Sequence, residues 1–127
     1  MFHHIIGTNV PRGDDMRKDI TDEEIAKLYL FLDLAIKNLL YDMKCIYDGP
    51  IKIKDHYTHY IESLLSKARE EMRKIKKEMY DRKIHVIHTG EDRLFSFYKF
   101  VLDREEYEKF YHKAVIKKNV EYVINNL

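Results

Sequence analysis

A single amphipathic stretch from Lys54 to Arg82 constrains the fold of this chain more than any other feature. Its apolar residues recur in steps of three and four, which keeps one face of a helix apolar for about eight turns. These residues are Tyr57, Ile61, Leu64, Ala68, Met72, Ile75 and Met79. A helix of this length gains little stability alone, so neighbouring segments must supply the surface on which its apolar face packs.

A second long helix is predicted directly before this stretch. Thr21 and Glu24 have the spacing of a capping box, in which each side chain accepts a hydrogen bond from the other's backbone N–H. We expect this helix to reach about Tyr47, where the Asp-Gly-Pro sequence at 48–50 ends it. The short connector that follows predicts that the two helices form an antiparallel pair.

Apolar residues cover most of the circumference of this first helix. One apolar face can pack on the long helix, and the other needs a second partner. That partner is either the C-terminal helix or another copy of the chain. In the second case the protein is a homodimer, and its predicted interface consists of Leu30, Phe31, Leu34 and Tyr41.

The residue pattern changes after Arg82. Residues 83–88 are rich in β-branched side chains, 89–92 have the composition of a turn, and 94–101 are aromatic and β-prone. This order predicts a β-hairpin. A helix over 92–102 is the alternative, because the apolar residues there also fit helical spacing.

Asp103 and Glu106 repeat the capping-box spacing and predict a final helix that ends at about Asn125. The expected fold is therefore mainly helical within the α+β class, with an antiparallel two-helix hairpin, a short β-hairpin and a C-terminal helix. We expect one helical domain over residues 21–127. Residues 1–20 combine Gly, Pro and a charge cluster without any period, which predicts a flexible N-terminal arm.

Composition excludes several classes of protein. The 127 residues carry a net charge of only +1 although 35% are charged, so there is no overall field of the kind that marks a polyanion binder. No apolar run is long enough to span a bilayer, and no secretion signal is recognisable. The single cysteine, Cys45, excludes an intramolecular disulfide and lies on an apolar stretch. We expect a cytoplasmic protein without a membrane partner, in which Cys45 is a buried structural thiol.

Histidines on the long helix raise a metal hypothesis. His56, His59 and Glu62 follow each other at steps of three, which places three candidate ligands on one side of the first two turns. The spacing is not specific, because it contains neither a Cys pair nor the His-Glu-x-x-His pattern of zinc sites. The alternative is that the two histidines cover the edge of the core. No cofactor is predicted.

The same helix carries a basic stripe in its second half. Arg69, Arg73, Lys76 and Lys83 recur at helical steps together with Tyr80, and such a stripe could follow the phosphates of a nucleic acid. Acidic residues on the adjacent faces dilute the positive charge. The alternative interpretation is a solvated helix face.

No catalytic motif accompanies these features, and the four scattered glycines form no phosphate-binding loop. The order of segments resembles small uncharacterised phage and prophage proteins of low-GC Gram-positive bacteria. The resemblance rests on Pro-Ile-Lys-Ile-Lys at 50–54 leading to Tyr57, the charged run 69–82, Lys-Ile-His-Val at 83–86 and the ending Val-Ile-Asn-Asn-Leu at 123–127. It implies an accessory protein of a mobile element, with no residue roles to carry over.

These observations predict a small non-enzymatic interaction or assembly module that is homodimeric or binds an unknown protein partner. The excess apolar surface of the first helix carries this prediction. The alternative is a nucleic-acid-binding protein that uses the basic stripe of the long helix.

Overall fold

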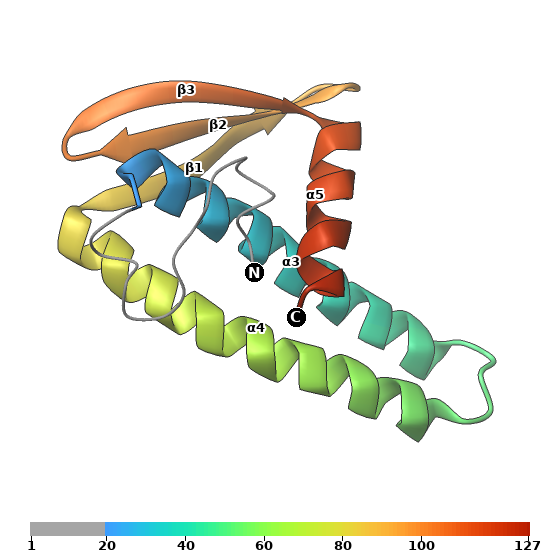
Figure 1. The fold of residues 1–127 in the computed structure, drawn as a ribbon. Coiled ribbons are helices and arrows are strands. Elements are labelled where there is room, and N and C mark those ends of the chain that lie inside the picture. Colours follow the sequence, from blue (N-terminus) through green and yellow to red (C-terminus); the bar gives the residue numbers. More distant parts are fainter. Residues whose placement is uncertain (1–19) are drawn as a thin grey trace.

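The computed structural model of the chain describes residues 20–127, which form three helices and one sheet. A three-stranded sheet lies over helix α3 (Asp22–Asp48), and α4 (Lys54–Arg82) runs along the opposite side of α3 (Figure 1). Helix α5 (Lys113–Asn125) packs beside α3. The predicted combination of an antiparallel helix pair, a short β-hairpin and a C-terminal helix is confirmed, and a third strand that was not predicted extends the hairpin. The predicted arm lies outside the described residues, apart from Ile20.

Helix α3 begins as its sequence predicts. The Thr21 hydroxyl accepts a hydrogen bond from the backbone N–H of Glu24, and the Glu24 carboxylate accepts one from the backbone N–H of Thr21, both at 3.2 Å. The capping box therefore satisfies two backbone donors that the first turn leaves without a helical partner. The helix ends at Asp48, one residue beyond its predicted end.

Helix α4 has the bounds of the amphipathic stretch and runs antiparallel to α3 (Figure 1). Its apolar face is buried, including Ile61, Ala68 and Ile75. The helix ends where Lys83 adopts a left-handed conformation with φ 57° and donates its backbone N–H to carbonyl oxygens of the last turn. This cap turns the chain directly into the first strand.

The sheet consists of β1 (Ile84–Glu91), β2 (Phe95–Leu102) and β3 (Glu105–His112). The strands are antiparallel in the order β1-β2-β3. The predicted hairpin is thus confirmed, and the helical alternative for residues 92–102 is wrong.

The prediction that the final helix starts at Asp103 is also wrong. Asp103 and Arg104 have φ values of 50° and 75° and connect β2 to β3 as a two-residue turn. A two-residue hairpin favours positive φ at both positions, because its twist then matches that of the strands. Strand β3 pairs with the second edge of β2, which a helix over this segment would leave without hydrogen-bond partners. The final helix therefore begins only at Lys113.

The core lies on both sides of α3, because this helix is enclosed between the sheet and α4. Phe100 from β2 and Ile75 from α4 are both fully buried in the same cluster as Phe31 of α3. Val123 of α5 covers a further side of α3. The second apolar face of the first helix is thus covered by the sheet and by α5 of the same chain.

Arg82, at the end of α4, ties this end to the start of α3. Its guanidinium donates to the Glu78 carboxylate at 2.9 Å, to the backbone carbonyl of Ile20 at 2.7 Å and to Asp22 at 3.3 Å. The side chains of Arg82 and Glu78 are only 19% and 9% exposed. A planar guanidinium suits such a site, because it directs several donors in fixed directions.

Candidate functional site

The outer face of the sheet points away from α3 and carries an aromatic cluster. Alternation along β2 buries Ser96, Tyr98 and Phe100 on the inner face, so Phe95 and Phe97 belong to the outer face. The pairing register places Phe110 and His112 of β3 opposite these two phenylalanines. We call Phe95, Phe97, Phe110 and His112 the aromatic cluster.

Side chains of the aromatic cluster contact one another and remain open to solvent. The ring of Phe95 packs edge to face against Phe110 at 5.7 Å and against His112 at 5.3 Å. Phe110 is 66% exposed and Phe97 is 37% exposed. Exposed phenylalanines that adjoin on one sheet face mark an interaction surface more often than isolated ones.

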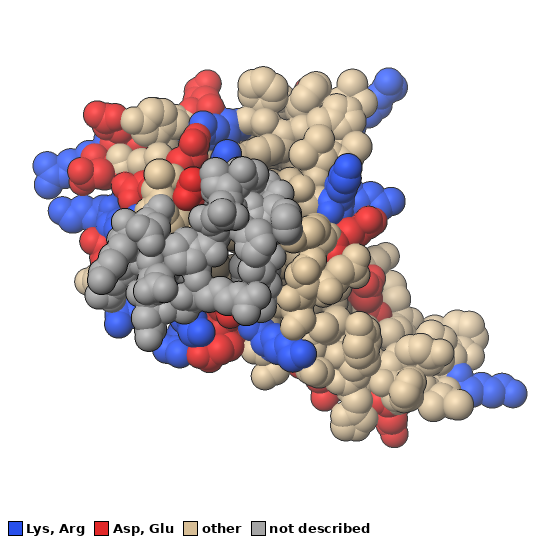
Figure 2. Space-filling model, viewed as in Figure 1, with Lys and Arg blue, Asp and Glu red and all other residues tan. Residues whose placement is uncertain are grey.

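Charged residues occupy the other end of the outer face. Lys99 lies opposite Glu108, and its ammonium is 3.6 Å from the carboxylate of Glu106. Figure 2 shows charged side chains gathered where β2 turns into β3, whereas uncharged side chains dominate at the end of the sheet above α5. The apolar surface is therefore confined to one end of the sheet.

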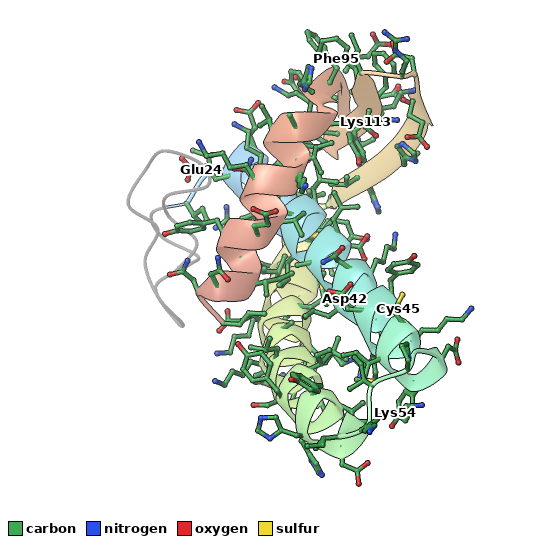
Figure 3. All side chains as sticks on the ribbon, turned by 90° about the vertical axis from the view of Figure 1, so that its right-hand side faces the viewer. Glu24, Asp42, Cys45, Lys54, Phe95 and Lys113 are labelled. Atoms are coloured by element: carbon green, nitrogen blue, oxygen red, sulfur yellow. The ribbon has the colours of Figure 1, made fainter. Side chains whose placement is uncertain are left out.

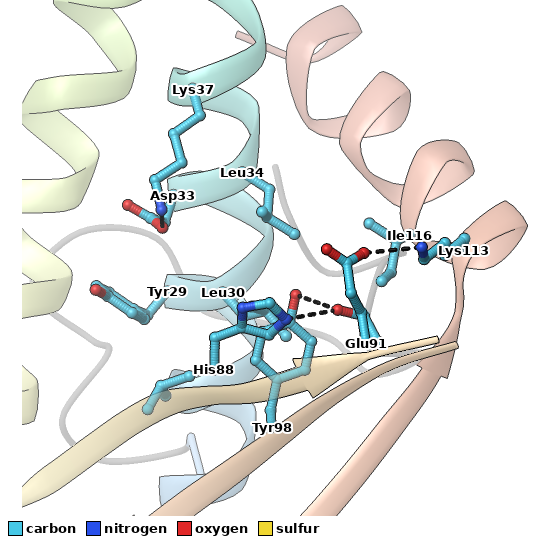
Figure 4. Close-up of a pocket in the computed structure, with 12 residues that line it drawn as sticks. Tyr29, Leu30, Asp33, Leu34, Lys37, His88, Glu91, Tyr98, Lys113 and Ile116 are labelled. Atoms are coloured by element: carbon cyan, nitrogen blue, oxygen red, sulfur yellow. Dashed lines mark hydrogen bonds and ion pairs between the residues drawn. The ribbon is translucent and has the colours of Figure 1, made fainter. Parts of the chain in front are cut away.

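The inner face forms the floor of a pocket between α3, the sheet and α5. Its volume is 440 Å³, within the range of pockets that hold small organic molecules. Figure 4 shows the labelled side chains of α3 above the strands and α5 on one side. The pocket is lined by Tyr29, Leu30, Asp33, Leu34, Lys37, Val86, His88, Glu91, Ser96, Tyr98, Lys113 and Ile116.

A β-bulge in β1 brings two polar side chains into this pocket. His88 pairs with Tyr98, whereas Gly90 pairs with Phe97 and Glu91 with Ser96, so Thr89 is an extra residue. In a regular strand, residues three apart point to opposite faces. The bulge places both His88 and Glu91 on the inner face.

Three polar groups at the floor form a hydrogen-bonded chain. Nε2 of His88 lies 3.0 Å from the Ser96 hydroxyl, which lies 3.3 Å from the Tyr98 hydroxyl. The rings of His88 and Tyr98 also pack together at 5.0 Å. Ser96 and Tyr98 are each 6% exposed, so this chain is held firmly at the base of the pocket.

Two ion pairs stand at the rim. On α3, Lys37 contacts Asp33 at 2.9 Å, and this hydrogen bond raises the pKa of Lys37. On the other side Lys113 contacts Glu91 at 2.8 Å, and this hydrogen bond lowers the pKa of Glu91. The rim therefore presents two ammonium groups that exposed carboxylates neutralise.

The turn between β1 and β2 fixes one wall of the pocket. The Asp92 carboxylate accepts hydrogen bonds from the backbone N–H groups of Leu94 and Phe95 at 2.9 and 2.7 Å, and these bonds lower the pKa of Asp92. The backbone N–H of Lys113 donates to the Leu94 carbonyl at 2.8 Å, which attaches the start of α5 to this turn.

Ser96 and His88 are residue types used together in nucleophilic catalysis, where a third group orients the histidine. Within residues 20–127 no carboxylate forms a hydrogen bond with His88. The pair therefore lacks the orienting partner of a catalytic triad in the part of the chain that the structure describes.

Three members of the predicted basic stripe lie on one face of α4, and Lys83 lies beyond it as the residue that caps this helix. Arg69, Arg73, Lys76 and Lys83 are all exposed. Arg73 contacts Glu70 at 2.6 Å, which raises the pKa of Arg73 and lowers that of Glu70. One of the four cations is thus partly neutralised by its own helix.

The predicted interface on the first helix needs correction. Leu30 and Phe31 are 3% and 1% exposed and belong to the chain's own core, so they do not face a partner in the folded chain. Leu34 is half-buried at the edge of the pocket, and Tyr41 is 66% exposed. Burial against the sheet and α5 explains the apolar excess of the first half of this helix, whereas Leu40 and Tyr41 remain exposed.

Cys45 is exposed, so the prediction of a buried thiol is wrong. Figure 3 shows its sulfur on the side of α3 that faces away from α4. Among the described elements, only α4 packs against α3 near Cys45, because the sheet does not extend over this end of the helix (Figure 1). An apolar neighbour such as Ile46 packs on α4, whereas Cys45 lies outside the contact.

The metal hypothesis gains no support from geometry. His56, His59 and Glu62 are all exposed on the first turns of α4. Among residues 20–127 no group of three His, Cys, Asp or Glu side chains is placed to hold a metal ion.

Sequence reasoning missed the pocket residues His88, Ser96 and Tyr98. The sequence held one indication of this site. Ser96 and Tyr98 are separated by steps of two from Phe100 on β2, so all three point to the same inner face. Polar groups at buried strand positions need partners, and their presence indicates a polar site on that face. The bulge turns Glu91 into the pocket, and the only feature of the sequence that hints at this bulge is the Thr-Gly pair at 89–90.

Comparison with known proteins identifies the family to which this chain belongs. The sequence model described as YhjD protein matches residues 17–127. The chain belongs to the YhjD protein family. It is also 32% identical over 91 residues to the uncharacterised protein YhjD of Bacillus subtilis strain 168, which covers 72% of this chain and 76% of that relative. No solved structure matches the chain.

The YhjD match covers every element of the described fold, from α3 to α5. The relative from Bacillus subtilis belongs to a low-GC Gram-positive bacterium, as the resemblance at the sequence level implied. Within residues 20–127 of this YhjD family chain, no helix is both long and apolar enough to cross a membrane.

Proposed function

We propose that this YhjD family protein is a small non-enzymatic interaction module that self-associates through the outer face of its sheet. The aromatic cluster is the observation that supports this function. Phe97 and Phe110 keep a large part of their rings in solvent on a face that no described element covers. Burial of aromatic rings is a major source of interface stability.

A second copy of the chain is the partner that this surface fits best. The aromatic cluster is open and contiguous and contains no Asp, Glu, Lys or Arg, so two copies related by a two-fold axis would bury ring against ring. Sheets stack face to face about 10 Å apart in this way.

The size of the surface sets the expected affinity. Three strands of eight residues span roughly 15 by 27 Å, or about 400 Å² per copy and about 800 Å² for two copies, which is below the area that stable dimers bury and typical of weak, transient contacts. We therefore expect a reversible dimer with a dissociation constant of roughly 1 to 100 µM.

Sedimentation velocity over a range of concentrations tests this function. The unaltered chain should pass from monomer to dimer, and Phe110→Glu should remain monomeric because it buries an unpaired charge at the interface. Tyr80→Glu is the matched control, since Tyr80 is 86% exposed and belongs to α4, not to the sheet. A monomer at all concentrations, or a dimer that Phe110→Glu leaves intact, contradicts the proposal.

Nucleic-acid binding is the second candidate function. The exposed positions of Arg69, Arg73 and Lys76 on one face of α4, with Lys83 exposed at the cap of this helix, favour it, because residues 69–76 alone extend over about 10 Å of helix. Fluorescence anisotropy with labelled single- and double-stranded DNA should then show salt-sensitive binding. Loss of binding in Arg73→Glu with Lys76→Glu, but not in Phe110→Glu, supports this candidate, and salt-independent or absent binding removes it.

Cytoplasmic location and a role as an accessory protein of a mobile element complete the proposal. The first is supported by the single cysteine, which suits a reducing compartment. The second follows from the resemblance to phage proteins alone.

A further inference from the structure

We propose that the pocket between α3, the sheet and α5 binds a small organic carboxylate with an apolar body. The pocket is open to solvent at its rim and closed by the sheet at its floor (Figure 4). This site is separate from the aromatic cluster, which lies on the opposite face of the sheet.

The walls fit an apolar body. Leu30 and Leu34 of α3, Val86 of β1 and Ile116 of α5 present aliphatic side chains to the cavity, and Tyr29 adds an aromatic ring. Burial and the nearby Asp33 charge raise the pKa of Tyr29, so its hydroxyl stays neutral. An aliphatic chain or ring would be in contact with apolar atoms from three different elements.

The floor has one hydrogen-bond donor that the protein does not use. With a neutral histidine, His88, Ser96 and Tyr98 carry three polar hydrogens, and only two hydrogen bonds join them. When Ser96 donates to Tyr98, the remaining hydrogen is on the Tyr98 hydroxyl, which rises from the sheet toward α3 (Figure 4). A ligand oxygen is the acceptor that completes this chain.

The rim supplies positive charge for that oxygen. Lys37 and Lys113 stand on opposite sides of the pocket, and their present partners, Asp33 and Glu91, are 30% and 57% exposed. Exposed ion pairs contribute little stability, so a lysine can exchange its carboxylate for that of a ligand at small cost. A protonated ligand amine could pair with Asp33 or Glu91, but it has no acceptor for the Tyr98 hydroxyl and would compete with Lys37 and Lys113.

Octanoate is a suitable probe, and octan-1-ol is its uncharged counterpart. We expect octanoate to shift the backbone amide signals of Val86, Ser96, Tyr98 and Ile116 in ¹H–¹⁵N spectra, with a dissociation constant of about 1 mM or tighter. Octan-1-ol should bind at the same amides but roughly fivefold more weakly.

Two variants separate the floor from the rim. Tyr98→Phe should weaken octanoate binding roughly fivefold, the factor expected for one hydrogen bond. Lys113→Met should bring the affinities for octanoate and octan-1-ol close together. Tyr80→Phe is the control, because it removes an exposed hydroxyl on α4 and should leave both affinities unchanged.

Folding of each variant is checked by its spectrum without ligand. Lys113 is 42% exposed, so Lys113→Met keeps the test valid even if Tyr98→Phe disturbs the buried floor. Octanoate shifts that spread over the aromatic cluster or α4, equal affinity for the two probes, or no shift at the pocket amides would each overturn the proposal.

Discussion

Tyr111 shows how a single residue of β3 reports on the packing of the sheet against α3. Its ring packs edge to face on Phe31 at 5.5 Å and lies 6.2 Å from Tyr98. Its hydroxyl is buried and has no hydrogen-bond partner in the described structure. Burial, followed by the Glu23 charge, raises the pKa of Tyr111 to about 12.

Tyr111→Phe should therefore stabilise the protein by about 1 kcal/mol at neutral pH, because it removes a buried hydroxyl without a partner. The unfolded chain loses the tyrosine proton near pH 10 and the folded chain near pH 12, so the native stability falls as pH rises through this window. The stability of the Tyr111→Phe variant should fall less steeply between pH 10 and pH 12. Urea unfolding at pH 7, 10 and 11 measures both effects, and a less stable variant would show that the hydroxyl has a partner.

Two residue pairs with the same spacing differ in what they form. Thr21 with Glu24 makes a capping box, whereas Asp103 with Glu106 begins with a hairpin turn. The local patterns are equivalent, and pairing with β2 decides between them. Whether the segment after Asp103 forms a strand depends on its pairing with β2, so the sequence near Asp103 alone could not predict it.

At the scale of elements, the long helices were predictable because their patterns are long. Helix α4 has the bounds read from its apolar steps, and α3 differs by one residue at its end. Strand β3 was missed because its apolar residues also fit a helical face. The pocket was missed because its residues come from four elements, α3, β1, β2 and α5, and because the bulge in β1 turns Glu91 to the inner face.

Arg82→Met should destabilise the protein by about 3 kcal/mol, because it leaves the buried Glu78 carboxylate without its guanidinium partner and loosens α4 from the start of α3. Arg82→Met combined with Glu78→Gln should recover part of this loss. Thermal unfolding of the single and the double variant compares their losses of stability. Equal destabilisation in both would show that the contacts to Ile20 and Asp22 dominate.

Arg104→Gly should stabilise the β2–β3 hairpin by roughly 1 kcal/mol, because Arg104 has a φ of 75° that glycine adopts without a steric cost. A glycine at the first turn of a helix would have no such benefit. Urea unfolding measures the difference, with Arg104→Ala as the matched control. Greater stability of the alanine variant would contradict the two-residue turn.

On the scale of the whole molecule, the two faces of the sheet divide the proposed roles. The inner face contributes to the core and to the pocket, and the outer face presents the aromatic cluster. Because the two proposed sites are on opposite faces, the proposed self-association would leave the pocket accessible. The sequence predicted an interaction module with an interface on helix α3, but burial of Leu30 and Phe31 moves the proposed interface to the sheet.

The most direct test of the central claim is an isotope-filtered NOE spectrum of an equal mixture of ¹³C-labelled and unlabelled chains at a concentration where the dimer forms. Only contacts between two copies give signals. Ile87 of β1 is 48% exposed and pairs with Lys99, so it lies on the outer face. The account predicts NOEs between copies among the rings of Phe97 and Phe110 and the side chain of Ile87. NOEs from Tyr41 and the far end of the helix pair, without signals from the sheet, would contradict it.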